Sequence, residues 1–150
     1  MSVDAARNLV EILLVEDSPT DVMMTQEALA YYKVLNPIRV ADDGVAAMEY
    51  LSRAGTHGTE RLPGLILLDL SLARRCGREV LEEIKCDPEL RKISVIILIT
   101  SKAEEDVVKS YGLHVNCFIT KPVDLTKLFD VVRTIEEFWL GVVALPRIAP

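Results

Sequence analysis

The sequence lacks several features that would assign it to whole classes of protein. Its 150 residues hold no apolar run near the ~18 residues that a membrane-spanning helix needs. The formal net charge is −6 and no cluster of lysine or arginine is present, so we expect neither nucleic acid nor an anionic membrane surface as a partner. The first residues lack the charged and then apolar layout of a secretion signal. We also find no internal repeat and no low-complexity stretch.

Cysteine is scarce. The three cysteines, Cys76, Cys86 and Cys117, are odd in number and their spacing fits no metal site. Together with the missing export signal, this predicts reduced thiols and a cytoplasmic location. Inert thiols are the favoured interpretation, and a redox role for Cys76 stays open.

What is present indicates one globular domain. Hydrophobic residues make up 50% of the chain and charged residues 27%, which is typical of a folded protein of this length. Short apolar runs alternate with longer helical patterns. Several of the runs are apolar throughout, as in parallel strands that are covered on both faces. The runs lie at 11–15, 38–40, 65–68, 95–99 and 117–119.

The helical patterns have clear starting signals. Ser18 precedes a proline and has Asp21 three residues later, and Ser101 has Glu104 at the same spacing. Both arrangements are typical of helix N-termini. Strand and helix therefore alternate five times, which predicts an α/β domain with a parallel sheet and right-handed crossovers. The predicted helices cover 19–32, 45–54, 78–86, 102–111 and 125–143.

Polar residues directly follow four of the predicted strands. Glu16 and Asp17 follow the first, Asp69 the third, Thr100 the fourth, and Lys121 lies just after the fifth. The carboxyl ends of parallel strands meet at one edge of the sheet, where ligands bind. Two carboxylates ~4 Å apart repel by about 4 kcal/mol at an effective dielectric constant of about 20. We expect Lys121 and a divalent cation such as Mg²⁺ to offset this repulsion.

Four short blocks together resemble the receiver domain of two-component response regulators. They are LLVED at 13–17, LLD at 67–69, ITS at 99–101 and TKP at 120–122. Gly77, eight residues after Asp69, matches the family's glycine in the loop that follows the phosphoacceptor. The resemblance implies a doubly wound (βα)5 flavodoxin-like fold with a five-stranded parallel sheet of order 2-1-3-4-5. It implies a single receiver domain over residues 1–150, with an extended C-terminal helix and tail over about 125–150.

The resemblance also implies roles for individual residues. Asp69 would be the nucleophile that accepts a phosphoryl group from a histidine kinase, a reaction that a carboxylate can perform. The protein would be no enzyme in the usual sense, because it would catalyse only its own phosphoryl transfer and dephosphorylation. Mg²⁺, or another divalent cation such as Mn²⁺ or Ca²⁺, would be bound by Glu16, Asp17, Asp69 and the carbonyl of Ser71. Phosphoryl binding and switching would fall to Thr100, Lys121 and Phe118. The peptide bond between Lys121 and Pro122 would be cis.

Three positions depart from the common family pattern: Ser71, Ala73 and Cys76. Ser71 would contribute only its carbonyl to the metal, so no ligand is lost. We expect the side chains of Ser71 and Lys102 to flank the path of the attacking water and to tune dephosphorylation.

The last predicted helix carries more apolar surface than one core needs. Its apolar arc of roughly 200° exceeds the about 100° that packing on a single domain requires. We expect a homodimer through the helical segments 102–111 and 125–143 and the C-terminal extension, with Phe138, Trp139 and Leu140 as anchors. A helix that folds back on its own domain is the alternative.

The C-terminal region also narrows the resemblance. IEEFWL at 135–140 and the segment 106–122 resemble the single-domain regulators that pair with phytochromes. This implies a phytochrome-type sensor histidine kinase as partner. Most response regulators carry an effector domain after the receiver, whereas this sequence ends at Pro150, so we expect output through a protein contact.

The same residues argue against two other functions. An aspartyl-nucleophile phosphatase needs a second aspartate where Ser71 stands, and a flavin phosphate would be repelled by Glu16 and Asp17. A phosphate sink and a phosphorylation-independent dimeric binding module stay open. The identity of the kinase and target, the phosphoryl lifetime and the effect of phosphorylation on the dimer also stay open.

Overall fold

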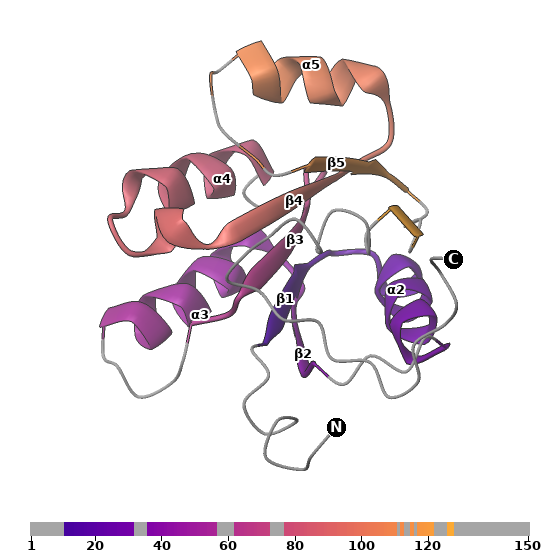
Figure 1. Cartoon of the computed structure of the whole chain (residues 1–150), viewed down its shortest axis with the longest axis horizontal. Helices are drawn as coiled ribbons and strands as arrows, with labels where there is room; N and C mark the ends of the chain where they lie inside the picture. The colour runs from indigo at the N-terminus through magenta and orange to yellow at the C-terminus, as the bar shows by residue number, and fades with distance from the viewer. Residues whose placement is uncertain are drawn as a thin grey trace, which may run out of the picture.

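Five parallel strands form one sheet in the order β2-β1-β3-β4-β5, which confirms the predicted fold (Figure 1). The structure is a computed structural model that describes residues 11–31, 36–56, 62–72, 77–110, 112, 115, 117–121 and 126–127. Each strand begins and ends within one residue of its predicted position. The strands are β1 (Ile12–Val15), β2 (Ile38–Ala41), β3 (Leu65–Asp69), β4 (Ser94–Ile99) and β5 (Cys117–Thr120).

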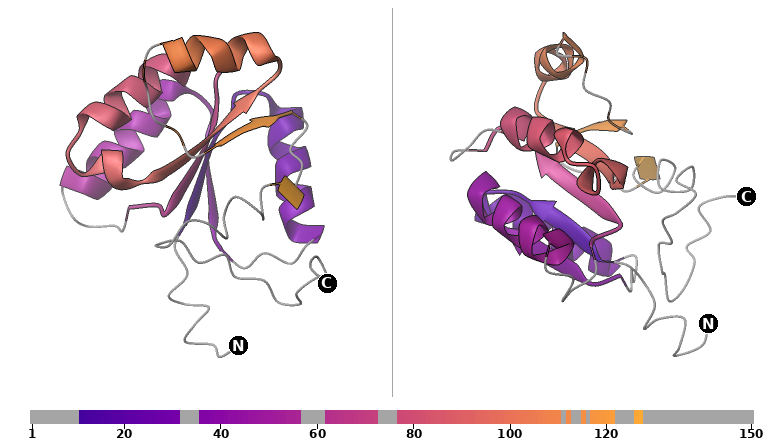
Figure 2. Two further views of the ribbon diagram at one scale, coloured as in Figure 1. Left: turned by 45° about the horizontal axis from the view of Figure 1, so that its top comes forward. Right: turned by 90° about the vertical axis from the view of Figure 1, so that its left-hand side faces the viewer.

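Helices lie on both sides of this sheet. Figures 1 and 2 show α3 and α4 on one face, α2 on the opposite face, and α5 beyond the ends of α4 and β4. The predicted helix over 125–143, with the expected dimer residues Phe138, Trp139 and Leu140, lies outside the described residues apart from 126–127. The described helices are α2 (Pro19–Tyr31), α3 (Gly44–Thr56), α4 (Gly77–Cys86), the short 3₁₀ helix η1 (Leu90–Lys92) and α5 (Lys102–Ser110).

The central strands are buried because helices cover both of their faces. All residues of β1 and β3 are buried, which agrees with their uninterrupted apolar sequences. Alternate residues of β1, β3 and β4 pack with Leu51 of α3 and Leu81 of α4 in one core cluster. Each such side chain gains roughly 1.5–3 kcal/mol from burial. By contrast, Arg39 and Val40 of the edge strand β2 are exposed.

Polar side chains fix the starts of two helices. The Oγ atom of Ser18 accepts a hydrogen bond from the Asp21 amide at 3.2 Å, as predicted for the cap of α2. Oδ1 of Asp43 accepts a bond from the Ala46 amide at 2.7 Å and caps α3 in the same way. These caps determine where the chain leaves the edge of the sheet and turns into each helix.

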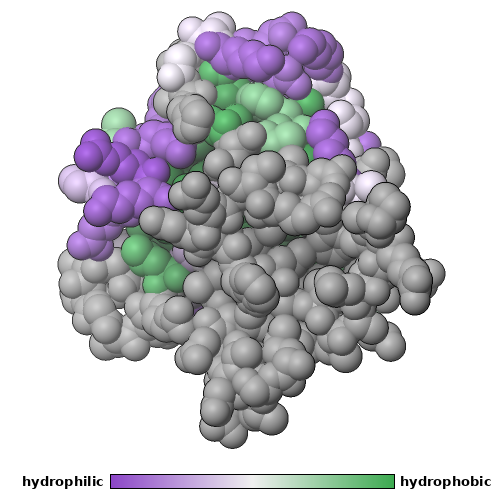
Figure 3. Space-filling view, in the orientation of Figure 1, coloured by the Kyte–Doolittle hydropathy of each residue, from purple (hydrophilic) through white to green (hydrophobic). Residues whose placement is uncertain are grey.

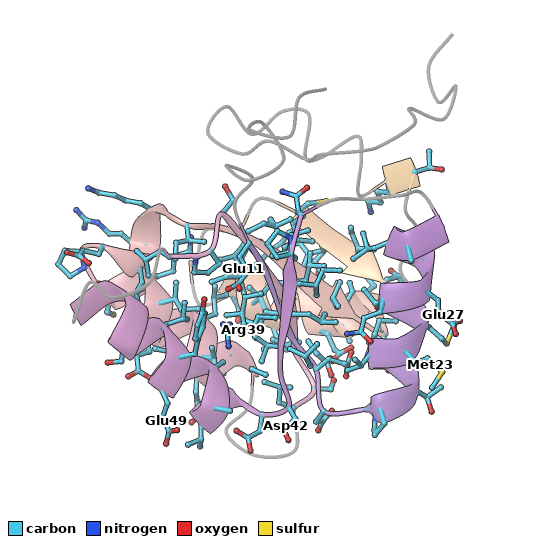
Figure 4. All side chains as sticks on the ribbon, turned by 90° about the horizontal axis from the view of Figure 1, so that it is seen from below. Glu11, Met23, Glu27, Arg39, Asp42 and Glu49 are labelled. Atoms are coloured by element: carbon cyan, nitrogen blue, oxygen red, sulfur yellow. The ribbon has the colours of Figure 1, made fainter. Side chains whose placement is uncertain are left out.

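A second polar group lies at the opposite edge of the sheet, where β1 and β2 begin. Figure 4 shows Glu11 and Arg39 side by side there, and Met23 and Glu27 pointing outward from α2. Nε of Arg39 lies 3.4 Å from the Glu11 carboxylate, and its guanidinium carbon lies 4.3 Å from the centre of the Tyr50 ring. The Tyr50 hydroxyl donates a hydrogen bond to Glu11. None of the helices in the described ranges is long and apolar enough to span a bilayer.

Candidate functional site

The three predicted metal-binding carboxylates converge at the carboxyl edge of the sheet. β1 and β3 are neighbours, with Val15 paired to Leu68, so the residues that follow Val15 lie beside Asp69. One carboxylate oxygen each from Glu16, Asp17 and Asp69 lies within 4.8 Å of the others. Glu16 and Asp69 are almost fully buried, with 1% and 2% exposure.

Lys121 brings a positive charge to this cluster. Its Nζ atom lies 3.1 Å from Oε1 of Glu16, 2.9 Å from Oδ2 of Asp21 and 3.4 Å from Oδ2 of Asp69. Its backbone amide donates to the Ile99 carbonyl at 2.8 Å, which fixes the end of β5 beside β4. Burial disfavours the ammonium, but the contacts with Asp21 and Glu16 and the charge of Asp69 outweigh it, so the pKa of Lys121 lies above its usual range.

One ammonium does not balance the buried negative charge. Burial, and next the neighbouring Asp69, raise the pKa of Glu16 to about 7 although Lys121 acts in the opposite direction. The carboxylates therefore remain in unfavourable proximity, and an additional cation would relieve it. Hard carboxylate oxygens in this number suit Mg²⁺ or a similar divalent cation. The donor set therefore fits the predicted metal.

The loop after β3 is held close to Asp69. The Ser71 amide donates to Oδ1 of Asp69 at 3.1 Å. A Cβ atom on Gly77 would lie 2.5 Å from the Asp69 carbonyl oxygen and 2.6 Å from Cα of Leu70, so only glycine fits there. The two departures at Ala73 and Cys76 lie outside the described residues.

Thr100 has partners that the sequence analysis did not predict. Oε1 of Glu104 accepts bonds from both the amide and the hydroxyl of Thr100, each at 2.5 Å. Oε2 of Glu104 accepts a bond from the Ser71 hydroxyl, also at 2.5 Å. In the sequence, the only indication of a contact made by Glu104 was its predicted capping role. That role predicts a bond with Ser101 and not with the hydroxyls of Thr100 and Ser71.

The remaining predicted residues lie nearby or outside the described ranges. Phe118 of β5 is half-buried and packs against the core cluster, with Nζ of Lys109 lying 5.8 Å from its ring centre. Pro122, and with it the predicted cis peptide, lies outside the described residues. Cys86 is exposed and Cys117 is half-buried, and both are free thiols.

Comparison with known proteins agrees with this geometry. Residues 12–133 match the family described as response regulator receiver domain. Response regulator Rcp1 of Synechocystis sp. is 48% identical over 135 residues, which cover 90% of this chain and 92% of Rcp1. The crystal structure of its Mn²⁺-bound form matches with a TM-score of 0.67 and 47% identity, covering 91% of this chain and 99% of that one.

Two further solved structures are similar. The bacteriophytochrome response regulator AtBRR has a TM-score of 0.82 and 38% identity, covering 91% of this chain and 99% of that one. The phosphorylated cyanobacterial phytochrome response regulator RcpA has a TM-score of 0.69 and 48% identity, covering 92% and 99%. The family match over 12–133 and the identity to Rcp1 settle the assignment. The chain belongs to the response regulator receiver domain family of two-component signalling, and it is similar to the regulators of phytochromes.

Proposed function

We propose that Asp69 accepts the phosphoryl group in this regulator. The observation that carries the proposal is the position of Lys121, whose ammonium lies 3.4 Å from Asp69 and 3.1 Å from Glu16. A carboxylate nucleophile and a cation for the phosphoryl oxygens are thus already together in the free protein. Phosphoryl transfer depends mainly on such positioning and charge.

The other site residues have supporting roles in this proposal. Glu16, Asp17, Asp69 and the carbonyl of Ser71 would hold a divalent cation. The convergence of the three carboxylates and the Mn²⁺-bound form of the relative Rcp1 support this. When bound, Mg²⁺ supplies positive charge to the phosphoryl oxygens. Lys121 contributes a second positive charge beside Asp69.

Transfer and hydrolysis then use the same atoms. A carboxylate oxygen of Asp69 bonds to phosphorus while the bond from phosphorus to the kinase histidine breaks. Thr100 donates a hydrogen bond to the phosphoryl group, and Phe118 changes position. A cis peptide bond between Lys121 and Pro122 is part of the proposal. Hydrolysis returns Asp69 as a carboxylate, and Ser71 and Lys102 flank the path of the water. The protein catalyses only these two steps on itself.

We propose a phytochrome-type histidine kinase as the donor. The similarity to Rcp1, AtBRR and RcpA supports this choice. A cytoplasmic location of the regulator is part of the same proposal. We further propose one receiver domain over residues 1–150. Two copies of the chain form a homodimer through the segment 102–111 and the C-terminal part, with Phe138, Trp139 and Leu140 as anchors.

Intact-mass measurement tests the acceptor. After incubation with Mg²⁺ and acetyl phosphate, the wild-type chain gains one phosphoryl group, whereas Asp69→Asn gains none and EDTA abolishes the gain. A gain that persists in Asp69→Asn contradicts the proposal. If acetyl phosphate is no donor, a phytochrome kinase and an unrelated histidine kinase are compared as donors. If neither kinase transfers a phosphoryl group to the chain, Asp69 is excluded as an acceptor.

A further inference from the structure

Glu104 joins two loops of the proposed phosphoryl site through one carboxylate. Oε1 binds the amide and hydroxyl of Thr100, which follows β4, and Oε2 binds the hydroxyl of Ser71, which follows β3. All three hydrogen bonds are 2.5 Å long. Hydrogen bonds to an ionised carboxylate belong to the stronger class of hydrogen bonds. Burial works against ionisation of Glu104, but the bonds from Ser71 and Thr100 outweigh it, so the pKa of Glu104 lies below its usual range.

The Thr100 hydroxyl has only one proton to donate. In this structure that proton goes to Glu104, which lies on α5. The same hydroxyl is the group that would donate to a phosphoryl oxygen on Asp69. It cannot serve both anions at once, so binding of the phosphoryl group requires that the bond to Glu104 break.

The same contact attaches the first turn of α5 to the strand ends. Of the nine residues of α5, all of which the structure describes, only Val108 is buried. The outer side of this helix carries exposed charges from Lys102, Asp106 and Lys109, and Figure 3 shows a hydrophilic surface at its position in the view. Among the described residues, α5 contributes only Val108 to the buried interior, so the bonds of Glu104 help to attach this end of the helix.

We propose that Glu104 is a positioning residue that competes with the phosphoryl group for the Thr100 hydroxyl and thereby holds Thr100 and the start of α5 in the unphosphorylated arrangement. The inference rests on the proposed role of Asp69. Arrival of the phosphoryl group moves the Thr100 donor from one anion to another and frees Glu104. Because coupling between two sites is reciprocal, weakening the hold of Glu104 strengthens phosphoryl binding.

Three variants of the 150-residue chain test this competition. Glu104→Gln keeps the length of the side chain and loses its charge, and Glu104→Asp keeps the charge and loses reach. Glu105→Gln is the matched control, because it removes the same charge from the same helical turn. Glu105 itself pairs with Lys102 at 2.8 Å and with Lys109 at 2.7 Å. Beryllofluoride, a phosphoryl mimic, serves as the probe in the presence of Mg²⁺.

Calorimetry measures the affinity, and NMR follows the Thr100 amide. Both Glu104 variants are expected to bind beryllofluoride about five-fold more tightly, the difference between a charged and a weakened hydrogen bond. Glu105→Gln is expected to stay within about two-fold of wild type, because Glu105 pairs with Lys102 and Lys109 of its own helix rather than with Thr100 or Ser71. In the free Glu104→Gln variant, the Thr100 amide resonance shifts toward its position in the mimic-bound wild type, which a merely structural role would not produce.

The outcomes separate this inference from the proposed function. Unchanged or weaker binding by the Glu104 variants overturns it, and so does an equal gain in Glu105→Gln. If the wild type binds no mimic, the role of Asp69 fails and the inference fails with it. If Glu104→Gln does not fold by circular dichroism, Glu104→Asp carries the same prediction with the same readouts.

Discussion

Replacing Asp69 by asparagine is expected to stabilise the metal-free protein near neutral pH. The Asp69 carboxylate is buried and lies in the same cluster as Glu16. Burial, and next the neighbouring Asp69, raise the pKa of Glu16 to about 7. Asparagine has nearly the same shape and can still accept the hydrogen bond that the Ser71 amide donates at 3.1 Å. It removes the negative charge, so the repulsion of Glu16 is relieved.

The size of the effect follows from the pKa of Glu16. A rise from 4.5 to about 7 corresponds to about 3 kcal/mol at roughly 1.4 kcal/mol per pH unit. The net effect is smaller for two reasons. Burial is the largest cause of the raised pKa of Glu16, and it remains in the variant. Lys121 also loses its partner Asp69 at 3.4 Å, although it keeps Glu16 and Asp21. We therefore expect a net gain of about 1–2 kcal/mol in the free energy of unfolding at pH 8.

The sign of the pH dependence is fixed by the same group. Folded Glu16 holds its proton more tightly than unfolded Glu16, so its contribution to stability falls as pH rises from about 4.5 to about 7. The fall is smaller in Asp69→Asn. The advantage of the variant is therefore small near pH 5, where folded Glu16 is protonated, and large at pH 8.

Urea denaturation in EDTA at the two pH values measures this difference. Asp106→Asn, an exposed change of the same charge on α5, is the control and is expected to stay within about 0.5 kcal/mol of wild type. Mg²⁺ should remove the advantage of Asp69→Asn, because the ion offsets the repulsion in wild type. Equal or lower stability of Asp69→Asn at pH 8, or the same gain at both pH values, would refute the reasoning.

Three further predictions concern the metal, a tyrosine and a glycine. Mg²⁺ affinity should rise between about pH 6 and 8, because Glu16, with its pKa of about 7, must lose its proton to bind the ion. Calorimetry should detect the released proton. An affinity independent of pH would count against Glu16 as a ligand. Tyr50→Phe should lower the free energy of unfolding by about 1–2 kcal/mol in urea at pH 7, because Tyr50 donates to the Glu11 carboxylate. Burial and that bond raise the pKa of Tyr50 to about 12, so its contribution is complete below about pH 10 and is lost as pH rises through about 12. Gly77→Ala should cost about 1–3 kcal/mol in thermal unfolding, because a Cβ would lie 2.5 Å from the Asp69 carbonyl oxygen.

The sheet was predictable because its physical cause is local. Residues 65–68 and 95–99 are apolar without interruption, and in the structure all of β3 and every residue of β4 after Ser94 are buried. The convergence of Glu16, Asp17 and Asp69 followed from the same reasoning, since parallel strands bring their carboxyl ends to one edge. Both predictions are confirmed.

The contacts of the capping residues could not be predicted in this way. Asp21 was expected to act at the start of α2, but its carboxylate also binds Lys121, one hundred positions later in the chain. Glu104 was expected to cap α5, and besides its contact with the Ser101 backbone it reaches Thr100 and, across 33 positions, Ser71. Sequence spacing predicts a bond within one helical turn. The partner of a flexible charged side chain depends on which loops the completed fold brings near it.

The location of the phosphoryl group can be measured directly. Borohydride reduces an aspartyl phosphate to homoserine, which tandem mass spectrometry can place in the sequence. After phosphorylation with Mg²⁺, we expect homoserine at position 69 and its loss in EDTA. Homoserine at position 17, or reduction at no aspartate of a phosphorylated chain, would contradict the assignment of Asp69 as the acceptor.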